Sequence, residues 1–289
     1  MVPLHLTCFC SDTNLAVFQE AAELLFHGFR RAGAEVKWAP RSTRRGAINV
    51  VFAAHRLPSS QIPQLVGDRV ILNFEQVCAP GAWRVTDAAT YRNLLQSSSV
   101  IDYSERNRAW LSSELHVEAE ILMLGHEPEL ERIARASSQD IDVLFYGAIT
   151  PRRKETLIAL QRSGLRVVVI DGMPLVFGNE RDALISRSRV VLNLHAYDTH
   201  IFEQVRVNYL LINGKAVVAE VADDTEMPRP YRPLVEPAWG IDPIVDRCRQ
   251  LVCSERLRSE REEVAREGMR TYPQSRLLTE IACLKPALP

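Results

Sequence analysis

The chain has 289 residues, of which 46% are hydrophobic and 25% charged, and its formal net charge is −1. This is the composition of an ordinary folded protein with enough residues for two domains. The near-neutral charge excludes the strongly basic surface of a general nucleic-acid binder, so we expect no nucleic-acid partner.

The first half of the chain alternates strand and helix patterns. A short apolar strand at 4–10 precedes a helix at 15–32, which Gly33 ends in the position usual for a C-terminal glycine. Such an alternation is typical of a mostly parallel sheet covered by helices. The further strands are predicted at 48–54, 69–74, 99–102 and 119–124, and the further helices at 88–96 and 105–114.

A polar segment at 125–140 has little apolar periodicity and is interpreted as a linker, after which the alternation restarts. We therefore predict an α/β protein with two Rossmann-like, doubly wound domains that face each other across a ligand-binding cleft. The predicted strands of this half are 141–146, 165–170, 189–194 and 216–219, and the helices are 152–163, 179–187, 200–212, 241–270 and 274–284. The predicted parts are 1–125, 126–272 and a C-terminal helical segment at 273–289, whose packing against the first domain is left open.

Cationic residues gather where the first strand of the second domain ends. Gly147 follows that strand, and Arg152 and Arg153 lie in the first turn of the next helix, for which Thr150 is a candidate N-cap. Cations in a first turn oppose the helix dipole, so a bound anion is favoured over a solvated basic helix start. Arg206 adds a guanidinium group suited to bidentate binding of phosphate. The pattern predicts a site for a phosphate-bearing ligand at the carboxyl edge of this sheet.

Other polar residues of the second domain follow its strands. His195 comes directly after the strand at 189–194 and is either a satisfied structural histidine or a ligand contact. Glu203 has three open roles: a favourable carboxylate near a helix start, an ion-pair partner of Arg206, or an acceptor for ribose hydroxyls. The residues that follow the strand at 165–170, where a nucleobase could lie against backbone amides, are Asp171, Gly172 and Met173.

Polar side chains also follow strands of the first domain. Glu75 comes directly after the apolar residues ILNF and is either a general base for an acceptor hydroxyl or a salt-bridge or capping residue. His55 is the second candidate base, because an imidazole titrates close to working pH. Ser104 is the predicted N-cap of the following helix.

Several familiar signals are absent from the sequence. It has no GxGxxG after the first strand, no P-loop, no HExxH and no GxSxG, which argues against an NAD-type fold, a P-loop enzyme, a zinc protease and an α/β-hydrolase. Residues 1–14 do not resemble a signal peptide, and no apolar run approaches the ~18–20 residues that span a bilayer. We expect a cytoplasmic protein without a transmembrane segment, with its six scattered cysteines reduced.

Several stretches resemble a known group of enzymes. Tyr146-Gly147 with Arg153, FGNERDALISRSRVVLNLHAY, and FEQVRVNYLLINGKAVVAE are similar to the donor half of GT-B glycosyltransferases. ILNFEQV and VIDYSERN resemble the acceptor domain of that group, and GHEPEL resembles its interdomain junction. The chain is most similar to small bacterial members of the glycosyl-transferase group 1 type.

The resemblance implies a hexosyltransferase-like enzyme that moves a sugar from a nucleotide-diphosphate donor to an acceptor hydroxyl. Residues 126–272 would bind the donor and residues 1–125 the acceptor. The nucleotide sugar is then a co-substrate and no cofactor is implied. No metal is implied either, because enzymes of this group generally hold the diphosphate with cationic side chains and a helix N-terminus.

The resemblance also assigns roles to particular residues. The diphosphate would lie near Gly147, Arg206 and Arg152 or Arg153, and the ribose and base near Glu203 and 171–173. The sugar would face His195 and His126, and the acceptor would face His55 and Glu75. The catalytic candidates are Glu75, His55 and His195, and the donor-binding candidates are Gly147, Arg152, Arg153, Asp171, Gly172, Met173, Glu203, Arg206 and His126.

The sequence departs from the large retaining families of this group. Those families carry two glutamates eight positions apart before a Gly-x-Pro-Val-Val strand, where this chain has Ile201 and Tyr209. The arginine that usually follows the first glycine of the donor domain is Ala148. Retaining and inverting chemistry both stay open, as do an epimerase or hydrolase of the same fold and a non-catalytic sugar-nucleotide-binding partner protein. The sugar, nucleobase, acceptor and oligomeric state are also left open.

Overall fold

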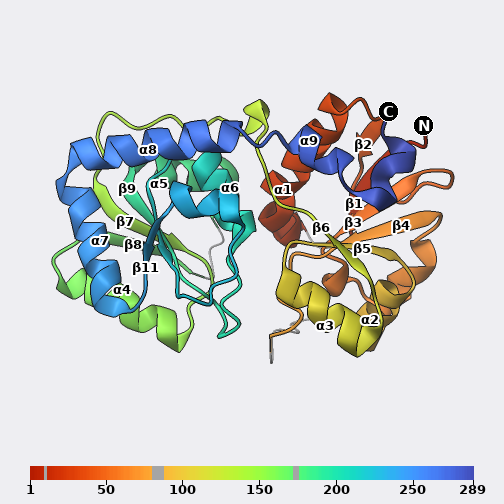
Figure 1. Cartoon of the computed structure of the whole chain (residues 1–289), viewed down its shortest axis with the longest axis horizontal. Helices are drawn as coiled ribbons and strands as arrows, with labels where there is room; N and C mark the ends of the chain where they lie inside the picture. Colours follow the sequence, from red (N-terminus) through yellow and green to blue (C-terminus); the bar gives the residue numbers. More distant parts are fainter. Residues whose placement is uncertain (10–11, 80–87, 172–175) are drawn as a thin grey trace. The chain divides into compact units, whose positions relative to one another are not determined.

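The computed structural model describes residues 1–9, 12–79, 88–171 and 176–289, with the side chains of 12–14 left out. The chain divides into two compact units. The N-terminal unit comprises Met1–Glu129 together with Tyr272–Pro289, and the C-terminal unit is Leu130–Thr271. The sequence patterns placed these divisions at 125/126 and 272/273. Figure 1 labels the elements of both units.

The N-terminal unit is built on a six-stranded parallel sheet in the order β2-β1-β3-β4-β5-β6. The strands are β1 (Leu4–Cys8), β2 (Val36–Trp38), β3 (Ile48–Phe52), β4 (Asp68–Leu72), β5 (Ser99–Asp102) and β6 (Ala119–Ile121). The α-helices are α1 (Asp12–Arg31), α2 (Ala88–Gln96), α3 (Glu105–Leu115) and α9 (Gln274–Thr279). The 3₁₀ helices are η1 (Ala54–Arg56), η2 (Ser59–Gln64), η5 (Ala282–Ala287) and, at the boundary of the units, η3 (Pro128–Leu130).

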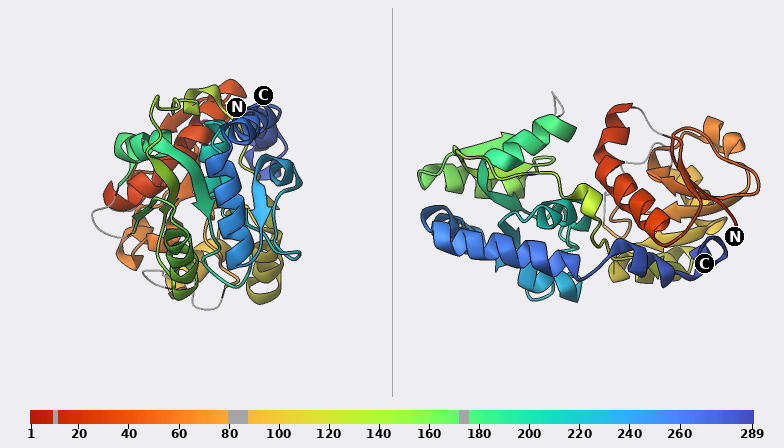
Figure 2. Two further views of the ribbon diagram at one scale, coloured as in Figure 1. Left: turned by 90° about the vertical axis from the view of Figure 1, so that its left-hand side faces the viewer. Right: turned by 90° about the horizontal axis from the view of Figure 1, so that it is seen from above.

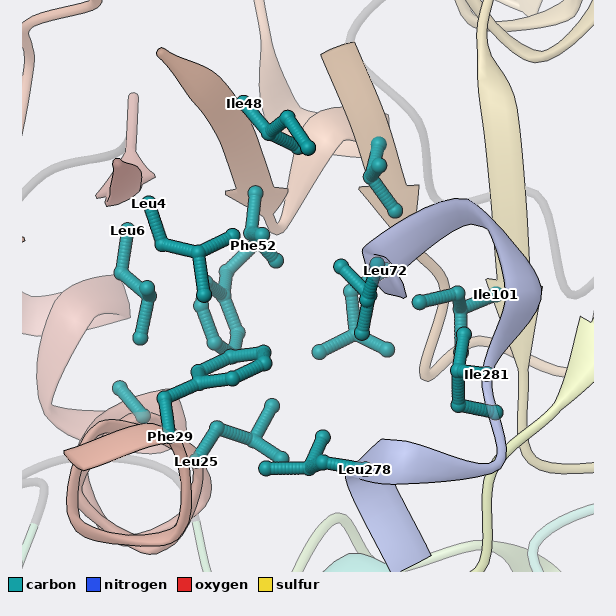
Figure 3. Packing of buried hydrophobic residues seen from close by; sticks show 14 of the residues in the cluster. Leu4, Leu6, Leu25, Phe29, Ile48, Phe52, Leu72, Ile101, Leu278 and Ile281 are labelled. Carbon is teal, nitrogen blue, oxygen red and sulfur yellow. The ribbon is translucent and has the colours of Figure 1, made fainter. Parts of the chain in front are cut away.

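Burial on both faces explains the apolar strands of this sheet. Every residue of β1 and β3 is buried, as expected for parallel strands covered by helices on each side. Figure 3 shows Leu25 and Phe29 of α1 packed against strand residues such as Phe52. Leu278 and Ile281 from the end of the chain complete the same cluster.

The two ends of the chain therefore lie together in the N-terminal unit, as Figure 2 shows in both views. The backbone N–H of Val2 donates to the carbonyl of Pro286 at 2.9 Å. In addition, α1 and α9 are neighbours: the Cα of Gly28 faces Gln274 and Leu278 so closely that a Cβ there would lie 2.9 Å from the Gln274 side chain. The absence of a side chain at Gly28 lets the two helices approach.

The C-terminal unit holds a five-stranded parallel sheet in the order β11-β10-β9-β7-β8. The chain passes from β7 to β8 on one side and returns to β9 on the other, so the strand order reverses between β7 and β9. The strands are β7 (Ile141–Tyr146), β8 (Val167–Ile170), β9 (Ser188–Asn193), β10 (Val217–Glu220) and β11 (Glu236–Ala238). The helices are α4 (Pro151–Arg162), α5 (Gly178–Arg187), α6 (Gln204–Ile212), α7 (Ile241–Cys253), α8 (Glu255–Arg270) and the 3₁₀ helix η4 (Arg229–Leu234).

The elements differ from the predicted ones at a few places. The predicted helix 200–212 begins only at Gln204, because the preceding residues form an irregular loop fastened by side chains described below. The stretch 241–270, predicted to be helical, contains two helices, and Ser254 between them caps the second by accepting from the Leu257 N–H. The caps expected at Ser104 and Thr150 are confirmed, since each side chain accepts from the backbone N–H three residues on. Within the described residues, no helix is both long and apolar enough to cross a membrane.

Candidate functional site

Three residues that the sequence placed around a phosphate lie together where β7 ends in the C-terminal unit. Gly147 follows β7 with φ of +137°, a conformation that favours glycine. A Cβ at this position would lie 2.6 Å from Arg206 Nη2 and 3.8 Å from Arg153 Nη1. Two guanidinium groups therefore converge on the strand end at the point where the strand order reverses, the place at which parallel sheets bind ligands.

Arg206 carries the uncompensated charge of this group. Its Nη1 donates to Asn193 Oδ1 at 3.2 Å, and its guanidinium lies over the rings of Phe145 and Tyr146, at 5.8 and 5.6 Å from their centroids. The side chain is half-buried, and none of the described carboxylates pairs with it. A guanidinium in this position is prepared to bind an anion bidentately.

Arg153 has a different role from the phosphate ligand predicted from the sequence. The residue is 2% exposed. Its Nε donates to the carbonyl of His195, its Nη1 to that of Ala148 and its Nη2 to that of Leu194 and to Glu203 Oε1. Burial lowers the pKa of Arg153 to about 10, with Glu203 acting in the opposite direction, so the group stays charged at neutral pH. Arg153 connects α4 to the residues that follow β9 through these hydrogen bonds. Its positive charge is buried next to Gly147 and does not face solvent.

Glu203 lies at the N-cap position of α6, near the helix start as one of its three predicted roles has it. Its Oε1 accepts from the N–H of Ala196 at 2.9 Å and from Arg153, and its Oε2 accepts from Asn193 Nδ2 at 3.1 Å. The side chain makes no capping bond to α6, and it pairs with Arg153 in place of Arg206. Glu203 thereby fastens the loop that leads from β9 into α6, and its role as an acceptor for ribose hydroxyls stays a prediction.

Arg152 is held at the same edge by a residue that the sequence analysis missed. Glu220, the last residue of β10, accepts from Arg152 Nη1 at 3.0 Å and lies 2.6 Å from its Nη2. The same carboxylate accepts from the N–H of His195. The Arg152 guanidinium lies 5.1 Å from the centre of the Trp239 ring, which is 44% exposed. Glu220 and Asn193 both end apolar strands, VVAE and VVLN, so the strand-end signal that found Gly147 also applies to them.

His195 is completely buried, which corrects its proposed contact with a sugar. Its Nε2 lies 3.3 Å from Thr225 Oγ1, and its ring stacks on that of His200. Burial lowers the pKa of His195, while the carboxylates of Glu203 and Glu220 act in the opposite direction. A ring with no exposed surface supports the loop and does not meet a substrate.

Two of the remaining donor-binding candidates, His126 and Asp171, are described by the structure, and two are not. His126 is buried in the N-terminal unit, where its N–H donates to the carbonyl of Tyr272 and its carbonyl accepts from the N–H of Gln274. This position corrects its assignment to the donor-binding domain. Asp171 is exposed and accepts from the N–H of Ile149 through Oδ1 at 3.2 Å. Gly172 and Met173 are not among the described residues.

In the N-terminal unit, the structure brings together the two candidate bases. His55 Nε2 lies 3.3 Å from Glu75 Oε1. His55 sits in η1 behind Ala53, whose φ of +50° places this alanine in the left-handed region. Burial lowers the pKa of His55 to about 4, with the charge of Arg56 as a smaller cause. The side chain of Glu75 is 35% exposed and that of His55 is 10% exposed. Glu75 is therefore the more accessible of the two.

A buried polar network surrounds the backbone of Glu75. Asn73, Asp102 and Asn107 are 2%, 0% and 0% exposed, and Tyr91 is 2% exposed. Burial raises the pKa of Asp102 to about 7, while hydrogen bonds from Asn73, Asn107 and Ser104 oppose the rise. The sequence analysis did not single out Asn73 or Asn107. Their signal was weak, because asparagines near strand and helix ends are common in turns and caps.

The described residues hold no group of three or more His, Cys, Asp or Glu side chains arranged to bind a metal ion. The five described cysteines, at positions 8, 78, 248, 253 and 283, are free thiols.

Comparison with known proteins begins from the sequence. No family model matches the chain. Two proteins of Acanthamoeba polyphaga mimivirus are similar to it: uncharacterized protein L140, 27% identical over 161 residues, and uncharacterized protein R358, 29% identical over 164 residues. These matches cover 53% and 55% of this chain and 49% and 53% of the viral proteins. The chain thus spans about half the length of the curated relatives it matches, and viral relatives do not support the bacterial origin that the resemblance suggested.

Solved structures decide the fold. T4 phage BGT in complex with UDP and Mn²⁺ superposes with a TM-score of 0.64 at 12% identity over 99% of both chains. The DNA-modifying enzyme β-glucosyltransferase follows at 0.62 and 12%, over 98% of both chains. WaaG, a glycosyltransferase involved in lipopolysaccharide biosynthesis, gives 0.53 and 11%, over 95% of this chain and 97% of its own. The chain has the GT-B fold.

The GT-B fold confirms the predicted class of two Rossmann-like α/β units with a C-terminal helical segment. Each GT-B unit of this chain presents one polar cluster at the carboxyl edge of its sheet. The C-terminal cluster centres on Arg206 and Gly147, and the N-terminal cluster centres on Glu75 and His55. The first is suited to hold an anion and the second to accept a proton.

Proposed function

We propose that this protein is a glycosyltransferase that moves a sugar from a nucleotide-diphosphate donor to an acceptor hydroxyl. The observation that carries the proposal is the half-buried Arg206 guanidinium, set against Gly147 without a carboxylate partner among the described residues. The GT-B fold, shared with structures of T4 phage BGT that hold UDP-glucose or UDP, supports this choice of ligand.

The C-terminal unit binds the donor. The diphosphate contacts Arg206 and approaches the backbone at Gly147, where no side chain intervenes. Arg153 supplies a second, buried positive charge behind the site, and Arg152 a third that Glu220 partly neutralises. As the glycosidic bond to the diphosphate breaks, negative charge grows on the departing phosphate, and preorganised cations stabilise it. Guanidinium groups take the part that a metal ion has in other transferases, so we propose that turnover needs no added divalent metal.

The N-terminal unit activates the acceptor. Glu75 removes the proton from the acceptor hydroxyl as the new glycosidic bond forms. The neutral imidazole of His55, with Nε2 3.3 Å from Glu75 Oε1, lies where it limits the orientations of this carboxylate. The greater exposure of Glu75 supports this order of roles.

The central test is Arg206→Ala in the full chain. We expect turnover to fall at least ~100-fold, the usual loss when one preorganised donor to a developing negative charge is removed. Arg187→Ala is the matched control, because this exposed arginine of the same unit pairs with Asp140 away from Gly147. Wild-type turnover in a folded Arg206→Ala protein would rule out the assignment.

Ligand screening tests the proposal without an acceptor. Thermal-shift measurements with UDP, GDP, dTDP and CMP sugars should identify a donor, because a ligand at about 100 times its Kd adds about 2.7 kcal/mol to the free energy of unfolding. The shift and the turnover should survive EDTA. Conversion of the donor with no acceptor present would indicate an epimerase or a hydrolase. If no nucleotide sugar shifts the melting temperature, the assignment of a donor site is wrong.

A further inference from the structure

The backbone of Glu75 is held by side chains where regular secondary structure is absent. Three buried residues, Asn73, Asp102 and Asn107, surround it, and we call them the carboxamide clamp. Asn73 and Asp102 stand at the ends of the paired strands β4 and β5, and the N–H of Asn73 donates to the carbonyl of Ile101 at 2.9 Å. Asn107 comes from the first turn of α3. The topology thus brings two strand ends and a helix start to one point.

Every side-chain amide proton of the two asparagines is donated to the Glu75 carbonyl or to Asp102. Asn73 Nδ2 donates to the Glu75 carbonyl at 2.8 Å and to Asp102 Oδ2 at 2.6 Å. Asn107 Nδ2 donates to the same carbonyl at 2.7 Å and to Asp102 Oδ1 at 3.1 Å. Asp102 is therefore the common acceptor that orients both carboxamides toward Glu75.

The N–H of Glu75 is fixed as well. It donates to Asn73 Oδ1 at 3.1 Å, and the Tyr91 hydroxyl donates to the same oxygen at 2.7 Å. The clamp consequently holds the donor and the acceptor of this residue's backbone. Beyond the clamped backbone, the Glu75 side chain reaches Oε1 to 3.3 Å from His55 Nε2.

The chemistry of the clamp is costly for a purely structural element. A buried carboxylate pays a large desolvation penalty, and apolar packing usually gives equal or greater stability at such a position. Burial indeed raises the pKa of Asp102 to about 7. Every group that the structure gives as bonded to this carboxylate is a donor, from Asn73, Asn107 and the N–H of Ser104. The arrangement therefore fits a buried hydrogen-bond acceptor that fixes the side chains of Asn73 and Asn107.

We propose that Asp102 is a positioning residue, which acts through Asn73 and Asn107 to aim the Glu75 carboxylate at the acceptor hydroxyl. This inference rests on the proposed role of Glu75 as the base. A misplacement of about 1 Å at a reacting group can cost ~100-fold in rate, so a clamp on its backbone has a measurable effect on turnover.

The test compares Asn107→Ala and Asp102→Asn with wild type in the full chain. We expect kcat to fall ~10- to 100-fold with the KM for the donor unchanged, because the donor is bound by other residues. The same substitutions made in a Glu75→Gln background should cause no further loss of kcat, since the carboxylate that they position is already gone. A structural defect would lower kcat in both backgrounds.

The matched control is Asn49→Ala. Asn49 is a buried asparagine of β3 in the same unit, and its Nδ2 donates to the backbone carbonyls of Arg44, Val66 and Asp68. It stands near the start of its strand, away from the carboxyl edge. We expect this variant to lose stability as the clamp variants do and to keep its kcat.

Hydrogen exchange provides a readout that does not depend on turnover. Loss of the acceptor Asn73 Oδ1 should speed exchange of the Glu75 amide by ~10-fold in Asn73→Ala, and the exchange should be unchanged in Asn49→Ala. The proposal is overturned if Asn73→Ala exchanges this amide at the wild-type rate, or if Asn107→Ala keeps wild-type kcat while Glu75→Gln is inactive. Wild-type kcat in Glu75→Gln would instead show that the base assignment is wrong, and the positioning role would fall with it.

Discussion

Individual side chains at the two sheet edges divide into those that hold the backbone and those that remain accessible. Arg153 donates hydrogen bonds to loop carbonyls and to Glu203, and Glu203 also accepts from a loop N–H group. Arg206 and Glu75 keep part of their charged groups exposed. The buried residues set the geometry, and the accessible ones are placed to meet a ligand.

The neutral state of His55 gives a prediction about pH. Its pKa in the folded protein is about 4, below the usual 6.5, so the unfolded chain binds the proton first as pH falls. The stability that depends on a neutral His55 is therefore complete above pH 6.5 and is lost as pH approaches 4. We expect the difference in unfolding free energy between wild type and His55→Gln to shrink by about 3 kcal/mol between pH 7 and pH 4. Urea denaturation at several pH values measures this, and a pH-independent difference would contradict it.

Sequence patterns predicted some of these residues and not others, for a physical reason. His55 and Glu75 follow neighbouring parallel strands, so strand order alone brings them together. The burial of His195 and Arg153 depends on how the loop after β9 folds over them, which no periodicity encodes. The partner choice of Glu203 is decided by the same loop.

At the level of elements, the turn between β7 and α4 lies at the end of the C-terminal sheet where we propose that the diphosphate binds. Thr150 caps α4 by accepting from the N–H of Arg153, and Pro151 supplies the first helical residue. Gly147 precedes them in a conformation open to glycine. The cap and the glycine together fix where Arg153 leaves the helix and how near Arg206 comes to the strand.

Gly147→Ala tests this turn. The new Cβ would lie 2.6 Å from Arg206 Nη2, so the guanidinium must move. We expect nucleotide binding to weaken at least ~10-fold, together with about 1–3 kcal/mol of lost stability from the strained backbone. Gly164→Ala is the control, because Gly164 has φ of +86° and nothing within 4 Å of its added Cβ. Equal nucleotide affinity in the two variants, measured by calorimetry, would show that Gly147 is not part of the nucleotide-binding site.

Long periodic elements were predictable, and two short strands were not. The apolar spacing of α1 and the continuous apolar runs of β3 and β7 are clear in the sequence. By contrast, β2 and β11 have three residues each, too few for a pattern to emerge from the surrounding loops. They exist because each pairs with a longer neighbour, β1 or β10.

For the whole molecule, the decisive feature is that the N-terminal unit is assembled from two distant stretches of chain. Its core includes Leu278, which is fully buried and packs in the cluster with Leu25 and Phe29. The sequence predicted the two Rossmann-like units from the restart of alternation after residue 125. The sequence left the packing of the last residues open, because the pattern of an amphipathic helix does not indicate which sheet the helix packs against.

Leu278→Ala tests the contribution of the returning segment. We expect the N-terminal unit to lose about 2–5 kcal/mol of stability, the usual cost of a cavity at a buried leucine. Hydrogen exchange during denaturation should show earlier opening of β1 and β3, with β7 and β9 unaffected. Thr279→Ala, an exposed position on the same helix, should change neither set of strands.

The interrupted composition of the N-terminal unit has a consequence for biosynthesis. A ribosome releases residues 130–271 as one continuous stretch, so the C-terminal unit can reach its native state during translation. The N-terminal unit cannot complete its core until Leu278, Ile281 and Leu284 have been synthesised, although most of this unit is made first. Nascent chains stalled before residue 272 would therefore leave apolar side chains such as Leu25 and Phe29 without their C-terminal neighbours, and chaperones that recognise exposed apolar residues would bind there.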